Sequence, residues 1–233
     1  MKANNRGSLI AIEGVDGSGK ETQTKKLYDR LKEEGVNIKK ISYPRYDKES
    51  SALVKMYLRG DFGDKPDDVS PYIASTFYAL DRYASYKEDY EEFYKQGGIV
   101  LADRYTTSNM VHQGGKIIDP KERERFLDWL WDYEFNLYKL PIPDLVFFLD
   151  IPVSINQKLR AGRLNKFSGK SQQDIHEKDR EHLEQSYENA SYLINKYNWK
   201  RIICIEKGEL MTPGKIHEKI YRETKIFLKS LSR

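Results

Sequence analysis

The sequence has few of the residues and runs that mark secreted or membrane-spanning proteins. It contains one cysteine, Cys204, in 233 residues, so an intramolecular disulfide is excluded and a reducing compartment is expected. Cys204 lies in the apolar run Arg201–Ile205, which favours a buried structural thiol. No apolar run approaches the length of a membrane span, and the N-terminus stays polar up to Ser8, unlike a signal peptide. We therefore expect a cytoplasmic protein.

Neither sign of charge dominates the chain. Its 40 basic and 36 acidic residues give a net charge of +4, which is too small to indicate a nucleic acid or a membrane surface as partner. Hydrophobic residues make up 39% of the chain and include 17 tyrosines and 9 phenylalanines, enough for a sizeable core. The length suits one α/β domain, so residues 1–233 are treated as a single domain with a small mobile segment.

Five short apolar runs separated by helical stretches predict a parallel sheet. The runs are Leu9–Glu13, Ile38–Tyr43, Ile99–Asp103, Leu145–Asp150 and Arg201–Ile205. Buried runs alternating with helices predict an α/β fold, with a five-stranded parallel sheet and helices on both faces. Ligands of such sheets gather at the carboxyl ends of the strands. We expect the site at that edge.

Capping residues predict where the helices begin and end. The expected helices are Lys20–Glu34, a second from Ser70-Pro71 toward Gly97, a third over about Lys121–Leu140, and a last one from Thr212-Pro213. In the second helix, the spacing of Ile73, Phe77 and Leu80 predicts a face turned to the core. In the last, the predicted buried stripe is Ile216, Ile220, Phe227 and Leu231.

One glycine-rich segment lies between the first strand and the first helix, where a phosphate-binding loop occurs. It reads Gly14-Val15-Asp16-Gly17-Ser18-Gly19-Lys20. Glycines allow backbone N–H groups to turn toward phosphate oxygens, and the following helix N-terminus adds partial positive charge. Lys20 supplies a full charge. A nucleoside triphosphate is the expected ligand.

The residue after Lys20 departs from the usual pattern of such loops. A Ser or Thr normally stands there and holds Mg²⁺, but this chain has Glu21, followed by Thr22. Glu21 can ligate the metal through its carboxylate, Thr22 can take over that role, or Glu21 can be a solvent-facing acid at a helix start. The sequence leaves these alternatives open.

A polar, basic segment covers residues 157–179 and contains Arg160 and Arg163. Such segments are usually solvated loops. Beside a phosphate loop, we interpret it as a mobile lid that closes over the triphosphate.

Aromatic and basic side chains indicate a second, anionic ligand. Tyr78 and Arg82 are four residues apart on the second helix, so ring and guanidinium share a face that suits a flat base joined to a phosphate. Asp103 and Arg104 directly follow a buried strand, where Asp103 can hold Mg²⁺ and Arg104 can reach a phosphate. Arg45 follows another strand. Structural ion pairs are the alternative for each arginine.

Taken in order, these motifs closely resemble those of thymidylate kinases, which belong to the nucleoside monophosphate kinase superfamily and have a P-loop NTPase fold. The resemblance runs from about Leu9 to the last helix. The matching segments are Ile12–Lys20, Tyr43–Tyr46, Phe77–Arg82, Asp103–Tyr105 with Ser108-Asn109, Pro143–Leu145 and the lid.

The resemblance implies transfer of the ATP γ-phosphoryl group to dTMP with Mg²⁺, for dTTP synthesis, by a homodimer. The implied roles are Tyr78 stacked on thymine, Arg82 at the base, Asn109 and Gln113 at the base edge, Arg45 and Arg104 at the acceptor phosphate, and Asp16 at the sugar 3′-hydroxyl or the metal. Because the loop itself carries no arginine, the lid must supply the catalytic charge through Arg160 or Arg163.

Two histidines depart from the family pattern. His112 stands where an aromatic residue usually crowds the 2′ position of the sugar, so discrimination against ribose is in question. In the lid, Asp174 and Glu177 match family positions, whereas His176 between them replaces a common aromatic residue and is expected to be exposed rather than catalytic.

Other functions are weighed against this one. A GTP-binding switch protein needs an Asn-Lys-x-Asp signature, and neither Asn165–Ser168 nor Asn195–Asn198 supplies the aspartate. A kinase for another nucleoside monophosphate remains an alternative, as does a non-catalytic nucleotide-binding protein, which the unusual Glu21 keeps open.

Overall fold

The computed structural model describes residues 6–155 and 180–231. Its central sheet has five strands in the order β2-β3-β1-β4-β5, and every neighbouring pair is parallel. The strands are β1 (Ser8–Glu13), β2 (Ile38–Ser42), β3 (Ile99–Asp103), β4 (Leu145–Asp150) and β5 (Lys200–Ile203). The predicted five-stranded parallel sheet is confirmed. The last predicted run is shorter than expected, because Ile205 begins a separate antiparallel hairpin of β6 (Ile205–Glu206) and β7 (Glu209–Leu210).

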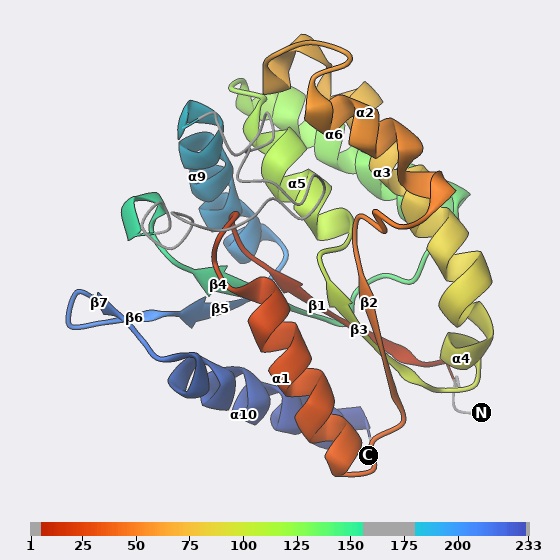
Figure 1. Ribbon diagram of the computed structural model, residues 1–233, viewed down its shortest axis with the longest axis vertical. Coiled ribbons are helices and arrows are strands. Elements are labelled where there is room, and N and C mark those ends of the chain that lie inside the picture. Colours follow the sequence, from red (N-terminus) through yellow and green to blue (C-terminus); the bar gives the residue numbers. More distant parts are fainter. Residues whose placement is uncertain (1–5, 156–179, 232–233) are drawn as a thin grey trace.

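Helices cover both faces of this sheet (Figure 1). They are α1 (Lys20–Glu33), α2 (Ala52–Arg59), α3 (Pro71–Ser85), α4 (Glu91–Lys95), α5 (Thr106–Gly115), α6 (Pro120–Trp131), α9 (Arg180–Lys196) and α10 (Pro213–Leu231). Short 3₁₀ turns occur at η1 (Glu49–Ser51) and η2 (Pro66–Asp68), and π-helical turns at η3 (Tyr86–Tyr90) and η4 (Asp132–Leu137). The four predicted helices are present, whereas α2, α5 and α9 were not predicted.

Helix boundaries follow the capping residues. The Ser70 hydroxyl accepts a hydrogen bond from the backbone N–H of Ile73 at 3.3 Å, which starts α3. Gly35 has a φ of 79° just after α1, a left-handed conformation that glycine adopts without strain. Beyond α3, the turn η3 interrupts the helical path before α4, so the long stretch predicted from Ser70 is divided.

The core has two layers because alternate residues of β1 point to opposite faces. Ile10 and Ile12 pack with Leu27 of α1 and Ile220 of α10. Leu9 and Ala11 point to the other face and belong to a second cluster, formed with residues of α5, α6 and α9. Burial on both faces explains why the central strands β1, β3 and β4 are mostly apolar.

The prediction of which face of α3 is buried was wrong. Ile73 is 54% exposed and Leu80 43% exposed, while Phe77 is only half-buried. The face turned inward instead carries small and charged residues: Ala74, Ser75, Ala79, Asp81, Arg82 and Ser85. Apolar spacing was misleading here because the protein buries charges on this helix and pairs them with distant partners.

The predicted stripe of α10 is confirmed only in its first half. Ile216 and Ile220 are buried, but Phe227 is half-buried and Leu231 is exposed. Cys204 is buried as predicted. Among the described residues, no helix is long and apolar enough to cross a bilayer.

Candidate active site

The phosphate loop connects β1 to α1 at the carboxyl edge of the sheet. Gly17 and Gly19 have φ values of 86° and 82°, so both turns need a residue without a Cβ. The Lys20 amine donates to the carbonyl oxygens of Gly14 at 2.7 Å and Val15 at 3.0 Å. The Ser18 hydroxyl is buried and has no hydrogen-bond partner in the described structure. A buried amine and an unsatisfied hydroxyl around a glycine-rich turn fit the oxygens of a bound phosphate.

Lys20 sits in a site that is unfavourable for its own charge. Burial and, to a smaller extent, the nearby Arg104 guanidinium together lower the pKa of its amine to about 8, against the opposite influence of Asp16 and Asp103. An anionic ligand would reverse this balance. The loop is therefore arranged to be electrostatically satisfied only when phosphate is bound.

Glu13, the last residue of β1, anchors the start of α5. It is fully buried, and its carboxylate accepts hydrogen bonds from the Tyr105 N–H at 3.0 Å, the Thr107 hydroxyl at 2.6 Å and the Ser108 hydroxyl at 2.8 Å. Burial raises the pKa of Glu13 despite these bonds. No role was predicted for this residue, although a carboxylate at the end of a buried strand is a signal that sequence reasoning can use.

Arg104 joins the phosphate loop to α5. It follows β3 with a φ of 66°, and its guanidinium forms an ion pair with Asp16 of the loop. Its Nη1 also lies 3.4 Å from the Ser108 hydroxyl and 3.3 Å from His112 Nε2. Because a guanidinium only donates, Nε2 must accept, and His112 is neutral. Burial lowers the pKa of His112 well below its ordinary value, which agrees with that assignment.

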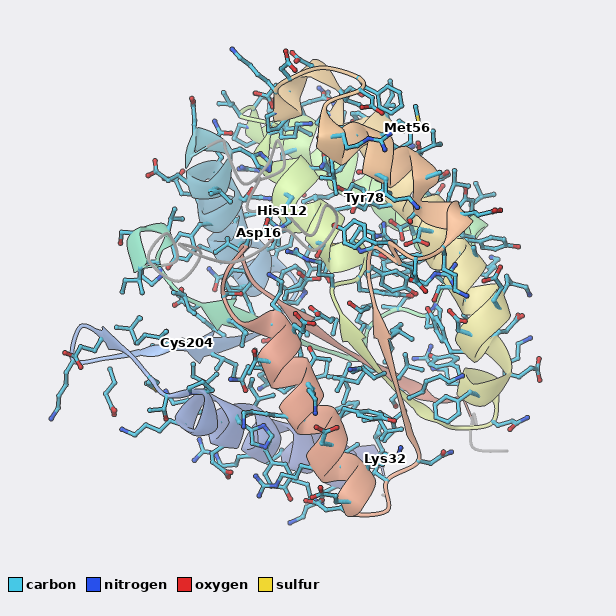
Figure 2. All side chains as sticks on the ribbon, in the orientation of Figure 1. Asp16, Lys32, Met56, Tyr78, His112 and Cys204 are labelled. Carbon is cyan, nitrogen blue, oxygen red and sulfur yellow. The ribbon has the colours of Figure 1, made fainter. Side chains whose placement is uncertain are left out.

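A cavity opens beside this arginine, between the phosphate loop, α3 and α5. Figure 2 labels Asp16, Tyr78 and His112, which come from these three elements. The lining residues are Asp16, Tyr43, Pro44, Tyr46, Leu58, Tyr78, Arg82, Arg104, Tyr105, Ser108, Asn109, His112 and Gln113. The structure thus brings together six of the residues predicted to hold the acceptor: Asp16, Tyr78, Arg82, Arg104, Asn109 and Gln113. The lining by Tyr43, Tyr46, Leu58, Tyr105 and Ser108 was not predicted.

Arg82 is almost entirely buried and is held by a carboxylate. Its Nε donates to Glu134 Oε2 at 2.6 Å and its Nη2 to Oε1 at 2.5 Å. This bidentate pair occupies one edge of the guanidinium and leaves Nη1 as the nitrogen that can face the cavity. Glu134 also accepts from the Thr106 hydroxyl at 2.6 Å. Sequence reasoning missed Glu134, which lies 52 positions from Arg82.

Arg45 was predicted at the acceptor phosphate, but the structure places it outside the cavity lining. Its guanidinium donates to Asp81 at 3.2 Å, Glu88 at 3.1 Å and Asp89 at 2.8 Å. The hydroxyl of Ser50 accepts a further bond at 2.9 Å. In this arrangement Arg45 ties the β2 exit to α3 and η3, so contact with a phosphate requires the guanidinium to leave these carboxylates.

Two acidic residues were predicted as metal ligands. Asp103 is buried at the end of β3, whereas Glu21 is exposed in the first turn of α1, as is Thr22. In residues 6–155 and 180–231, no cluster of three or more His, Cys, Asp or Glu could hold a metal ion by itself. Mg²⁺ bound mainly by phosphate oxygens and water needs only one or two carboxylates, so these residues fit that ion.

The lid prediction falls on residues that the structure does not describe. Residues 157–179, with Arg160, Arg163, Asp174, His176 and Glu177, lie outside the described ranges. Their roles stay predictions.

A parallel sheet with a phosphate loop at its carboxyl edge, and an aromatic and basic cavity beside that loop, defines a P-loop nucleotide kinase. The sequence model of the thymidylate kinase family matches residues 12–206. The chain is 30% identical over 174 residues to thymidylate kinase of Mycobacterium tuberculosis, covering 74% of this chain and 79% of that protein. It is 31% identical over 150 residues to human thymidylate kinase, covering 64% of this chain and 63% of that protein.

Similarity in structure agrees with the sequence comparisons. Thymidylate kinase from Candida albicans superposes with a TM-score of 0.71 at 20% identity, covering 95% of this chain and 92% of that one. This likeness confirms the P-loop NTPase fold. The chain belongs to the thymidylate kinase family.

Proposed function

We propose that this chain transfers the γ-phosphoryl group of ATP to dTMP, with Mg²⁺, and forms dTDP for dTTP synthesis in the cytoplasm. Family membership supports the reaction. The observation that carries the proposal for this chain is the position of Arg104, which contacts the phosphate loop through Asp16 and also lines the cavity between that loop, α3 and α5. A single guanidinium therefore lies between the site for the donor phosphates and the site for the acceptor.

The division of roles follows from the groups available. The loop N–H groups and the Lys20 amine bind the donor phosphates, and Arg104 holds the acceptor phosphate in line with them. Asp16 keeps Arg104 oriented and faces the 3′-hydroxyl of the sugar. When bound, Mg²⁺ neutralises phosphate charge, with Asp103 or Glu21 as its protein ligand. Closure of the lid brings Arg160 or Arg163 to the transferred group and excludes water.

The base lies at the other end of the cavity. Tyr78 offers a ring for stacking, and Arg82 presents Nη1 beside Asn109 and Gln113 on α5. Arg45 contributes to phosphate binding only if it leaves its carboxylate partners.

A panel of nucleoside monophosphates tests this function. Purified protein with Mg·ATP is assayed for ADP release with dTMP, dCMP, dGMP and dAMP, and dTMP is expected to react far faster than the others. Absence of turnover with dTMP would end the proposal. A higher rate with another monophosphate would reassign the acceptor.

We also propose that the chain forms a homodimer through α3. Ile73, Leu80 and Tyr83 form an exposed apolar stripe on this helix, because they are separated by seven and three residues. The stripe lies on the surface of α3 opposite the residues that line the cavity. Burial of this stripe against its copy in a second chain would also steady the helix that carries Tyr78 and Arg82.

A further inference from the structure

Lys116, just after α5, is a half-buried cation that no step of the proposed reaction uses. Its amine donates to the carbonyl oxygen of Val69 at 2.7 Å, to Gln113 Oε1 at 3.1 Å and to the Tyr57 hydroxyl at 3.4 Å. Of these partners, only Gln113 lines the cavity between the phosphate loop, α3 and α5, the proposed acceptor cavity. Lys116 is therefore connected to the base end of the site by its hydrogen bond to Gln113.

The contact with Lys116 fixes which way the Gln113 amide points. A glutamine amide has a donating nitrogen and an accepting oxygen, and it can present either to a ligand by rotating. An ammonium group only donates, so the atom that faces Lys116 must be the carbonyl oxygen. Gln113 Nε2 makes no hydrogen bond to another described residue, and the side chain lines the cavity. The amide nitrogen is thus the group presented to the ligand.

We propose that Lys116 is a positioning residue that holds Gln113 as a hydrogen-bond donor and so makes the cavity select a pyrimidine whose edge carries carbonyl oxygens over one that carries an amino group. This inference rests on the proposed function and deepens it. Arg82 also offers only donors through Nη1, so two donors meet the base edge. Thymine places carbonyl oxygens there, whereas the amino group of cytosine sets donor against donor.

Lys116 prevents the Gln113 amide from rotating to present its oxygen to the ligand. With the amide free to rotate, Gln113 could turn its oxygen toward an amino group and accept cytosine. With the oxygen held by Lys116, the mismatched base leaves a buried donor without a partner, which strongly disfavours binding. Selectivity thus depends on a side chain that does not touch the nucleotide.

The test compares kcat/KM for dTMP and dCMP at saturating Mg·ATP in the full-length protein. Lys116→Met is expected to lower the dTMP to dCMP ratio roughly tenfold, the effect of one hydrogen bond of ordinary strength. Lys116→Arg should keep the ratio, because a guanidinium also only donates. Gln113→Glu should shift preference toward dCMP, because a carboxylate held by Lys116 turns a second accepting oxygen to the cavity.

A matched control separates positioning from stability. Lys219 is also half-buried and donates to a backbone carbonyl, that of Ile203 at 2.9 Å, far from the cavity. Lys219→Met should leave the ratio unchanged. If Lys116→Met lowers both kcat/KM values equally, Lys116 is merely structural and the proposal is overturned.

The remaining outcomes are also decisive. If Lys116→Met does not fold, Gln113→Glu carries the test, and an unchanged ratio there overturns the proposal. If the wild-type protein has no turnover with dTMP, the proposed function fails. Calorimetric binding of dTMP and dCMP then tests Lys116 on its own, and an equal preference in wild type and Lys116→Met would overturn its role.

Discussion

Arg104 and Asp16 form an ion pair across the active site, one from the exit of β3 and the other from the phosphate loop, with each side chain 21% exposed. The pair is partly shielded from solvent, so salt screens it less than a fully exposed ion pair. Because Asp16 belongs to the loop that holds the donor, a change in either residue is expected to affect both nucleotides.

Replacing Arg104 tests this link. Arg104→Ala is expected to lower kcat/KM for dTMP by about 10²- to 10³-fold, because a charged hydrogen bond and the alignment of the phosphate are lost together. Arg104→Lys keeps the charge but not the forked geometry, so its kcat/KM for dTMP should lie between those of wild type and Arg104→Ala. Steady-state kinetics with varied dTMP provide the measurement, and an unchanged kcat/KM in Arg104→Ala would contradict the assignment.

The lowered pKa of Lys20 predicts how donor binding depends on pH. The amine of the free enzyme is charged below about pH 8 and neutral above it. Accordingly, kcat/KM for ATP should fall above about pH 8, while kcat should persist to higher pH because bound phosphate raises this pKa. A profile for kcat/KM that stays flat across this range would refute the prediction.

The same shift has a consequence for stability. Between about pH 8 and 10.5 the unfolded chain holds the Lys20 proton that the folded protein has released. This group therefore makes the free energy of unfolding of the ligand-free protein increase with pH in that window. Denaturant unfolding of wild type and Lys20→Met at several pH values measures the difference, and equal slopes in the two proteins would argue against it.

Glu21 is tested by its effect on the metal requirement. If it ligates Mg²⁺, Glu21→Ala should raise the Mg²⁺ concentration that gives half-maximal activity at constant ATP, because one of few protein ligands is lost. Glu33→Ala, an exposed acid in the last turn of the same helix, is the matched control. An unaltered Mg²⁺ titration in Glu21→Ala would show that the carboxylate is only a helix-start acid.

Close packing of α5 against α9 predicts a sensitive glycine. A Cβ at Gly115 would lie 3.0 Å from the Ser186 Cα and 3.1 Å from its backbone nitrogen. Because backbone atoms cannot rotate away, Gly115→Ala should destabilise the protein by roughly 1–3 kcal/mol in urea unfolding. Gly214→Ala, where nothing lies within 4 Å of the added Cβ, should not destabilise. Equal stability of the two variants would mean that α9 yields easily.

The proposed homodimer predicts the effect of a charge on α3. Leu80→Glu should convert a dimer into a monomer, because a buried carboxylate without a partner is costly at an apolar interface. Ile226→Glu, which changes another exposed residue on α10, should leave the mass unchanged. Light scattering after size-exclusion chromatography decides, and a wild-type monomer would refute the proposed dimer.

The parts of the fold that local sequence determines could be predicted. Strands buried on both faces are continuous apolar runs, and the phosphate loop needs its glycines and lysine at fixed spacing, so both were visible without a structure. Helix starts at Ser70 and Thr212 were visible for the same reason. Helix α5 could not be predicted, because nearly all of its residues are buried and its sequence therefore shows no distinct apolar stripe.

The parts that depend on distant partners could not be predicted. Arg82 was predicted to contact the nucleotide, but its burial and its bidentate pair with Glu134 could not be inferred from helix spacing. Arg45 looked available for a phosphate, but three carboxylates from α3 and η3 surround it. Ile73 and Leu80 looked like core residues because apolar spacing does not distinguish a core from a surface patch.

Helix α5 links the two ends of the proposed acceptor cavity. It begins two residues after Arg104 and carries Asn109 and Gln113, so one helix and the turn before it supply the residues proposed for the phosphate and for the base. Any shift of α5 along its axis would therefore displace both ends of the cavity together.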